Sequence, residues 1–404
     1  MKVLEIMGSL HRGGAETMIM NYYRAFDKEL CQMDFVIHKQ FDDDYCNEAK
    51  ENGAFIILLE RPGEIGIVRY IRTLLDVIRK YGPYEAIHIH TNYQAFLSVI
   101  AARIAGVKNI IVHSHTTAYT RNQLFINRLI FRICKVRKLS CGKLAGDAFF
   151  GTDYTIVRNA IPVSGFNKVD DNEVKKIRDR FHGRKIIGHL GSFARTKNHA
   201  FMLALMEEIK KSDPTVCLLL YGDGELKDEI KHQIKNKNLQ DNVYLMGVTS
   251  SPNIVYHAMD VFILPSLYEG FPVTLVEAQL SGTYALASNT ISKECNIGIS
   301  NIEFLELDKF LWANRIMAVA TLPKCTKKTE LNVDEYNVNV QWKKLYKIYK
   351  NDSEKNHADI IFSLPLIDLY IRQIFICQNI RLPIIAPFFK QSYCTIFNLT
   401  VQYQ

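Results

Sequence analysis

Short apolar runs alternate with longer amphipathic stretches along the first part of the chain. The short runs are continuous and rich in β-branched residues, as in buried parallel strands, and we expect strands at residues 2–7, 33–37, 55–59, 86–90 and 110–113. The longer stretches repeat apolar positions with a helical period, and we expect helices at residues 16–26, 42–52, 65–81 and 94–105. Strands that alternate with helices in this way predict a doubly wound parallel sheet.

A second alternating unit begins with the apolar run at residues 185–191. Expected strands follow at 216–221, 243–246 and 261–264, and expected helices at 200–211, 226–237 and 254–259. A polar, charged stretch at 168–184 separates the units, so we expect one domain at 1–165 and another at 166–351. The tail at 352–404 is apolar but interrupted by prolines and charges, so it lacks the run of about 20 apolar residues that a spanning helix needs. A surface-lying helix and a poorly folded extension both stay open for this tail.

The composition is that of a soluble globular protein. The chain has 404 residues, 48% of them hydrophobic and 23% charged, which is enough for two domains. Its nine cysteines are scattered and form no Cys-x-x-Cys motif, so we expect neither a disulfide framework nor a zinc site, and a reduced cytosolic location fits. Glu5 and Gly8 interrupt the apolar start of the chain, which we therefore interpret as a strand rather than a signal peptide.

The net charge of +8 is not evenly spread. Residues 116–144 contain no acidic side chain, while their basic ones alternate with apolar positions: Arg121, Arg128, Arg132, Lys135, Arg137, Lys138 and Lys143. On a helix this pattern makes a cationic amphipathic segment, so we expect residues 121–143 to contact an anionic membrane surface. An internal helix with a solvated basic edge is the alternative. No nucleic-acid-binding motif accompanies the charge, so nucleic acid is not expected as a partner.

Two glutamates flank a Gly-Phe-Pro break in the segment at 264–277, which reads LPSLYEGFPVTLVE. The apolar run before it predicts a strand and the pattern after Pro272 predicts a helix. Glu269 then lies on the loop at the carboxyl end of a strand and Glu277 in the first turns of the helix, which is where open α/β sheets bind ligands. Carboxylates beside free backbone N–H groups suit a ligand with both hydroxyls and phosphate, such as a nucleotide sugar.

This segment resembles the E-x7-E motif of the retaining glycosyltransferases of family 4. The resemblance runs in the family's order from residues 8–16 (GSLHRGGAE) to about Asn351, and the relatives it brings to mind are bacterial enzymes of capsular or exopolysaccharide assembly. It implies the GT-B fold, in which two Rossmann-like doubly wound parallel-sheet domains face each other across a cleft. It also implies that Glu269 contacts donor-sugar hydroxyls and Glu277 the ribose. The backbone around the phosphate is then supplied by Gly270, Phe271, Pro272 and Val273. The segment at 342–349 resembles the family's terminal helix, which returns to the first domain.

A basic loop follows the strand expected at 186–190 and reads GSFARTKNH. A cation at such a loop, beside a helix start, can hold a diphosphate without a metal. Lys197 matches the family's pattern, but Ser192 stands where relatives carry Arg. Arg195, three residues later, is then the candidate for the missing charge. A solvated basic turn is the alternative interpretation.

Two further features fall on strand ends. The paired glycines Gly13 and Gly14 permit close backbone approach, and the resemblance places them by the donor diphosphate and the acceptor; a plain tight turn is the alternative. By the same resemblance His113 lies near the reacting sugar. We expect at most one of His113 and His115 to face the cleft, and no histidine metal site.

His88 and His90 end another expected strand and are interpreted as structural. Two further segments, 222–224 and 246–248, are weaker candidates for the cleft.

Taken with the resemblance, these features predict a retaining glycosyltransferase with Glu269, His113 and Lys197 as catalytic residues. The donor is expected to be a nucleotide sugar, in particular a UDP-sugar, carrying a hexosyl or N-acetylhexosaminyl group. The acceptor is expected to be a saccharide, in particular a lipid-linked one, reached by a cytoplasmic enzyme peripheral to the inner membrane face. No metal or other cofactor is expected. A nucleotide-sugar epimerase of the same fold and a non-catalytic sugar-nucleotide-binding protein are the alternatives.

Overall fold

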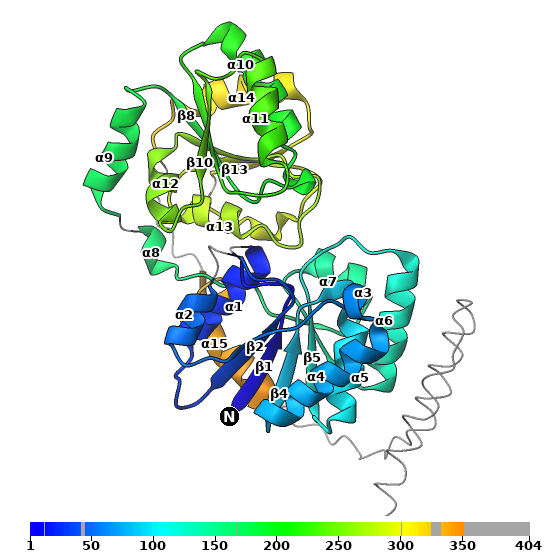
Figure 1. Cartoon of the computed structure of the whole chain (residues 1–404). Coiled ribbons are helices and arrows are strands. Elements are labelled where there is room, and N and C mark those ends of the chain that lie inside the picture. Colours follow the sequence, from blue (N-terminus) through cyan, green and yellow to red (C-terminus); the bar gives the residue numbers. More distant parts are fainter. Residues whose placement is uncertain (12, 42–44, 168, 300, 325–332, 351–404) are drawn as a thin grey trace, which may run out of the picture. The chain divides into compact units, whose positions relative to one another are not determined.

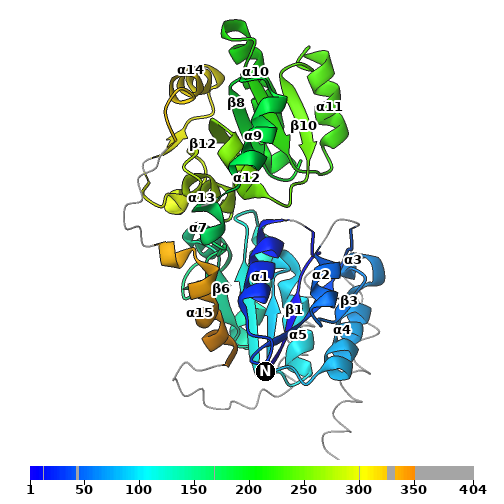
Figure 2. The ribbon, with the colours of Figure 1, turned by 90° about the vertical axis from the view of Figure 1, so that its left-hand side faces the viewer.

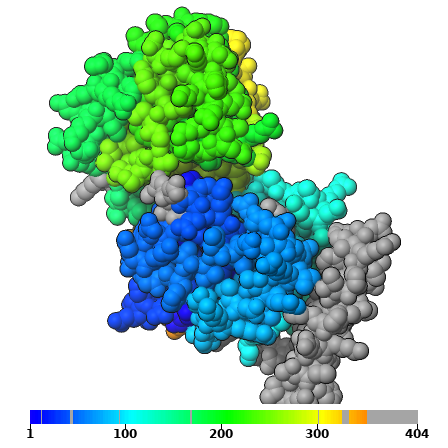
Figure 3. Space-filling view, in the orientation of Figure 1, coloured from blue at the N-terminus to red at the C-terminus, as the bar shows by residue number. Residues whose placement is uncertain are grey.

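The computed structural model describes residues 1–11, 13–41, 45–167, 169–299, 301–324 and 333–350, all of which belong to one compact unit, Met1–Asp352. Within this unit two parallel sheets carry helices between their strands, so the expected doubly wound architecture is confirmed (Figure 1). In the space-filling view each half is a continuous packed body (Figure 3). The tail expected at 352–404 lies outside the described residues.

The first sheet has seven strands in the order β3-β2-β1-β4-β5-β6-β7. They are β1 (Lys2–Ile6), β2 (Gln32–Ile37), β3 (Ile56–Leu58), β4 (Ala86–Ile89), β5 (Asn109–Ser114), β6 (Arg137–Ser140) and β7 (Thr155–Ile156). The helices of this half are α1 (Gly14–Ala25), α2 (Cys46–Glu51), α3 (Pro62–Ile65), α4 (Ile67–Tyr81), η1 (Asn92–Gln94), α5 (Ala95–Ile104), α6 (Arg121–Ile133) and α7 (Lys143–Phe149). The helix expected at 65–81 begins two residues late because Gly66, at φ +83°, separates it from α3.

The second sheet has six strands in the order β10-β9-β8-β11-β12-β13. They are β8 (Ile186–Leu190), β9 (Cys217–Tyr221), β10 (Val243–Gly247), β11 (Val261–Leu264), β12 (Tyr284–Ser288) and β13 (Ile302–Leu305). The helices are α8 (Ser164–Asn167), α9 (Asp171–Arg180), η2 (Arg195–Lys197), α10 (His199–Ser212), α11 (Lys227–Asn236), α12 (Pro252–Ala258), α13 (Val273–Leu280), η3 (Lys293–Cys295), α14 (Lys309–Val319), η4 (Val333–Glu335) and α15 (Val338–Lys350). The last strand of the first sheet ends at Ile156 and the first strand of the second begins at Ile186, on either side of the expected boundary.

The chain returns to the first half in α15, which packs against α1 (orange in Figure 2). Val338, Leu345 and Tyr349 of this helix are buried in the same apolar core as residues of β1, β2 and α1. Asn109, which begins β5, donates hydrogen bonds of 2.9 Å to the carbonyls of Ile348 and Tyr349. The last described helix is therefore part of the first domain's core.

Candidate active site

A cavity of about 660 Å³ lies at the carboxyl ends of strands from both sheets. The first half lines it with loops that follow β1, β5 and β7, and the second half with loops that follow β8, β9, β10 and β11. Its size is typical of small-molecule sites, and its place matches ligand binding in open α/β sheets. The lining includes most of the expected site residues: Gly13, Gly14, Lys197, Glu269, Gly270, Phe271, Pro272, Val273 and Glu277.

Lys197 and Glu269 form an ion pair in the cavity wall. The ammonium Nζ of Lys197 lies 2.6 Å from Oε1 of Glu269, and the side chains are 16% and 14% exposed. Lys197 ends η2 after β8, while Glu269 lies on the loop between β11 and α13, so the sheet order brings them together. An anionic ligand can compete with the carboxylate for this ammonium group, since both charges are partly shielded from water.

Glu277 lies on α13 with only 9% of the residue exposed. Tyr256 of α12 donates a hydrogen bond of 2.9 Å from its hydroxyl to Oε2 of Glu277. Burial raises the pKa of Glu277 to about 7, although the tyrosine hydrogen bond works in the opposite direction. A carboxyl in this state favours ligands whose hydroxyls donate to it, because such donors stabilise the ionised form.

The helix α13 begins at the cavity. Its first residues, Val273 and Thr274, line the cavity together with the N-cap residue Pro272. The start of a helix presents backbone N–H groups and the positive end of the helix dipole, which together favour a phosphate.

The loop after β8 differs in part from what the sequence predicted. Ser192 is exposed and lines the cavity beside Gly191, and Gly222 packs so tightly that a Cβ there would lie 2.0 Å from the Gly191 carbonyl oxygen. Gly222 and Asp223 also line the cavity, as proposed for the segment at 222–224. Arg195, in contrast, is exposed and outside the cavity lining, so in this structure it does not supply the charge that Ser192 lacks.

The start of α1 provides an open backbone surface. Apart from the chain neighbours and the backbone of α1, no atom of the described residues lies within 4 Å of the position that a Cβ would take on Gly14. A Cβ on the N-cap residue Gly13 would lie 2.4 Å from Oε2 of Glu16. Burial raises the pKa of Glu16 to about 7. The expected close approach of a ligand is thus sterically possible at Gly14, while Gly13 makes room for a side chain of the same helix.

The histidine assignment requires a correction. His113 is fully buried and does not line the cavity, whereas His115 does. Of the two, His115 alone lines the cavity, which agrees with the expectation that at most one of them faces the cleft. Residues two apart in a strand share a face, however, so packing and not strand alternation separates them. Their rings lie 4.3 Å apart, and both pack against His88 or His90 of the neighbouring strand.

A buried histidine cluster therefore exists where no metal site was expected. Ring nitrogens of His88, His90 and His113 lie within 4.8 Å of one another, close enough for a metal ion. Each of the three rings, however, makes a hydrogen bond within the cluster or to Glu5. These contacts leave Nε2 of His113 buried without a hydrogen-bond partner among the described residues.

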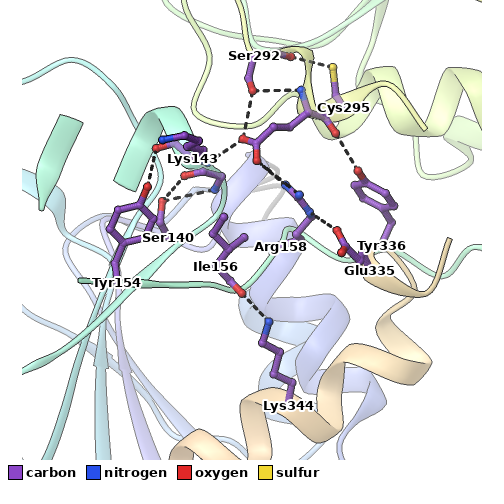
Figure 4. A network of polar contacts seen from close by, with 12 residues as sticks. Ser140, Lys143, Tyr154, Ile156, Arg158, Ser292, Cys295, Glu335, Tyr336 and Lys344 are labelled. Carbon is purple, nitrogen blue, oxygen red and sulfur yellow. Dashed lines mark hydrogen bonds and ion pairs between the residues drawn. The ribbon is translucent and has the colours of Figure 1, made fainter. Parts of the chain in front are cut away.

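A polar network joins the two halves next to the cavity (Figure 4). The carboxylate of Glu294 in η3 accepts a hydrogen bond of 2.7 Å from the backbone amide of Lys143 at the start of α7. Its other oxygen lies 3.4 Å from the guanidinium of Arg158, which follows β7 and also pairs with Glu335 at 3.1 Å. These three charged residues lie far apart in sequence, and no motif marked any of them.

The same network reaches the loop that carries Glu269. The Arg158 guanidinium lies 5.4 Å from the ring centroid of Phe271, which stacks on Tyr336. At Gly270 a Cβ would lie 2.0 Å from the carbonyl oxygen of His115, so the two backbones touch across the halves. Only glycine permits this approach, and it links the loop of the second half to the histidine loop of the first.

Comparisons with known proteins agree with this geometry. Residues 12–140 match the model of Glycosyltransferase Family 4, and residues 170–301 match that of Glycosyl transferases group 1. The Bacillus subtilis protein EpsF, which is named as a glycosyltransferase, is 32% identical over 376 residues, covering 88% of this chain and 98% of its own length. The chain belongs to the family 4 glycosyltransferases.

A further relative is named for capsular polysaccharide biosynthesis. The capsular polysaccharide biosynthesis glycosyltransferase CapH of Staphylococcus aureus is 23% identical over 86% of this chain and 98% of its own length. Among solved structures, Anabaena HepE with UDP and glucose aligns with a TM-score of 0.70 at 14% identity, covering 87% of this chain and all of HepE. These comparisons confirm the GT-B fold and a glycosyltransferase of polysaccharide biosynthesis.

The basic pattern at 121–143 suggested a single helix, but the structure does not have one there. The segment is divided into α6, the strand β6 inside the sheet, and α7. Arg128 donates hydrogen bonds of 2.8 and 3.1 Å to the carbonyls of Phe149 and Ala148, so it holds α7 rather than facing a membrane. Phe125 is 67% exposed and Leu144 43% exposed, so apolar side chains remain on this surface. Among the described residues, no helix combines the length and the apolar character needed to cross a bilayer.

Proposed function

We propose that the enzyme is a retaining glycosyltransferase that moves a hexosyl or N-acetylhexosaminyl group from a UDP-sugar to a saccharide acceptor carried on a lipid diphosphate. The observation that carries the proposal is the presence, in one cavity, of the Lys197–Glu269 pair, the carboxyl of Glu277 and the start of α13. UDP is present in the HepE structure, and an Escherichia coli relative, 24% identical over 61% of this chain, is named as a galactosyltransferase acting on a diphosphoundecaprenol-linked sugar.

In this proposal the second half binds the donor. Glu277 accepts hydrogen bonds from the ribose hydroxyls, while Lys197 and the first amides of α13 hold the diphosphate. When the phosphate takes over the Lys197 ammonium group, Glu269 becomes available for hydroxyls of the sugar. The ion pair thus keeps both groups in place until the donor binds.

The proposed reaction leaves the anomeric configuration unchanged. The acceptor hydroxyl oxygen forms a bond to the anomeric carbon on the face from which the diphosphate departs, the bond from that carbon to the diphosphate oxygen breaks, and the hydroxyl proton passes to the departing phosphate. The products are the new glycoside and UDP. Lys197 and the helix amides stabilise the charge that develops on the diphosphate, without a metal ion. Activity in the presence of a chelator should equal activity without it, and its loss would contradict a metal-independent reaction.

We further propose that the enzyme works at the cytoplasmic face of the membrane, with the exposed side of α6 on the lipid. Replacing Arg121 and Arg132 together with Ser should weaken binding to phosphatidylglycerol vesicles roughly 30-fold, since two surface cations contribute about 2 kcal/mol. A matched control replaces Lys231 and Lys235 of α11 with Ser. Equal binding by both variants would contradict the proposed surface.

The donor test begins with a thermal-shift screen of UDP- and GDP-sugars, followed by transfer of the stabilising sugar to a lipid-linked acceptor. We expect a UDP-sugar to stabilise the enzyme and to be transferred, and Glu269→Gln to bind UDP while transferring little sugar. UDP binding without transfer would favour a sugar-nucleotide-binding protein. Isomerisation of the donor with no acceptor present would favour an epimerase.

A further inference from the structure

Glu5 is a fully buried carboxylate with three hydrogen-bond donors. The hydroxyl of Tyr349 lies 2.7 Å from Oε1, Nε2 of His90 lies 2.9 Å from Oε2, and Nδ1 of His88 lies 3.2 Å from Oε2. Burial alone would raise the pKa of Glu5, but the two histidines more than offset it and hold the pKa at about 2. The donor-binding residues described above make no use of this charge.

A hydrogen-bonded chain leads from Glu5 to the cavity through His90 and His115. The ring of His90 contacts Glu5 through Nε2 and contacts Nε2 of His115 through Nδ1, at 2.8 Å. Burial lowers the pKa of His90 to about 4 and that of His115 well below its usual value, so both rings are neutral.

The hydrogen bonds from Glu5 through His90 to His115 fix which nitrogen of each ring carries the proton. A carboxylate can only accept, so Nε2 of His90 must donate to Glu5, and Nδ1 of the same neutral ring must be an acceptor. That acceptor requires a donor, so the proton of His115 is on Nε2. The remaining nitrogen of His115, Nδ1, is therefore an unprotonated acceptor.

This acceptor is unsatisfied within the described part of the chain. Nδ1 of His115 is buried and has no hydrogen-bond partner there, although His115 lines the cavity. A buried acceptor without a donor is unfavourable, and a bound ligand can relieve the cost. The ligands of this cavity in the proposed function are rich in hydroxyl groups.

We propose that Glu5 is a positioning residue that, through His90, holds His115 in the tautomer whose Nδ1 accepts a hydrogen bond from a sugar hydroxyl in the cavity. The hydroxyl belongs either to the transferred sugar or to the acceptor, and the inference rests on the proposed transferase function. His115 is the residue that contacts the sugar, and Glu5 acts only through His115.

Two substitutions of His115 separate its two nitrogens. The amide of Asn lies near the position of Nδ1, and the amide of Gln near that of Nε2. His115→Gln should lower kcat/KM for transfer roughly 10- to 100-fold, the cost of losing a buried hydrogen bond. His115→Asn should recover part of that loss because its amide oxygen can accept. Equal activity of His115→Gln and wild type would overturn the proposal, as would a larger loss in His115→Asn.

Glu5→Gln tests positioning, because an amide can both donate and accept and no longer forces one tautomer. It should lower kcat/KM in the wild-type background and cause no further loss in the His115→Gln background, since both changes remove the same contact. Asp34→Asn is the control, as Asp34 is a buried carboxylate of the neighbouring strand that bonds Lys2 and Tyr84 instead. Its effect should be the same in both backgrounds. Additive losses for Glu5→Gln would overturn the positioning role.

A further measurement on the unmodified enzyme does not depend on how Glu5→Gln folds. Nitrogen NMR of 15N-histidine-labelled protein, with His115 assigned by its loss in His115→Gln, should show the proton on Nε2. A proton on Nδ1 would overturn the proposal.

Two kinetic arms identify the source of the hydroxyl. If it belongs to the transferred sugar, His115→Gln should slow donor hydrolysis without acceptor as much as transfer. If it belongs to the acceptor, transfer alone should slow. Failure of the wild-type enzyme to transfer any sugar would instead count against the proposed function.

Discussion

Donor binding should weaken as the pH falls below neutral, because Glu277 must be ionised to accept hydrogen bonds from two ribose hydroxyls. Burial raises the pKa of this carboxyl to about 7. About nine tenths of the molecules then carry the carboxylate at pH 8, and about one tenth at pH 6. If only the ionised form binds well, the Kd rises about tenfold between these values, or about 1.4 kcal/mol.

Isothermal titration of UDP-glucose, or of the UDP-sugar that stabilises the enzyme most, measures this directly at pH 6, 7 and 8. A UDP-sugar is a suitable probe because its diphosphate has no group that titrates near neutral pH. Glu277→Gln should bind more weakly at pH 8 and show little pH dependence. Glu16→Gln should keep the wild-type profile, although the Glu16 pKa is also raised to about 7, because Glu16 does not line the cavity.

The direction in which the Kd changes with pH tests the role of Glu277. A group that gained positive charge at low pH would strengthen the binding of an anionic donor, which is the opposite of what we expect. A Kd that stays constant from pH 8 to pH 6, or falls, would refute the role of Glu277. So would a Glu277→Gln variant that keeps the wild-type pH dependence.

Three further predictions concern the cavity and its borders. Lys197→Met should weaken UDP binding in titration by about 2 kcal/mol, since it removes a charge-assisted contact, and tight binding would contradict its phosphate role. Gly270→Ala places a Cβ 2.0 Å from the His115 carbonyl oxygen, so transfer should fall sharply while UDP binding persists; unchanged transfer would show that this contact is not needed. Glu294→Gln replaces the carboxylate that accepts from the backbone amide at the start of α7 with a neutral acceptor. It should lower the Tm by a few degrees, with a smaller change in UDP affinity. Glu335→Gln should change the Tm little, because the side chain of Glu335 is 64% exposed.

The sequence predicted the parts of the site that are local to one strand end. Glu269 and Glu277 belong to a single strand, loop and helix, and Lys197 belongs to another, so periodicity and loop position were enough to bring them to one edge of a parallel sheet. The terminal strands β12 and β13 were not predicted, since no recognised motif accompanies their short apolar runs.

The tertiary contacts of the site could not be predicted from the sequence. The buried charge of Glu5 was used only to exclude a signal peptide, yet it lies opposite His88 in the register of β1 and β4. Such a pairing depends on strand order, which one sequence does not reveal. Alternation along β5, applied correctly, would have placed His113 and His115 on one face, but only packing shows that His115 is the one at the cavity.

The stereochemistry of the product tests the central proposal most directly. The enzyme is incubated with the α-linked UDP-sugar found in the screen and a lipid-linked saccharide, and the new linkage is determined from its anomeric proton coupling by NMR. The account predicts an α-linked product, formed without added metal. A β-linked product would contradict the retaining reaction.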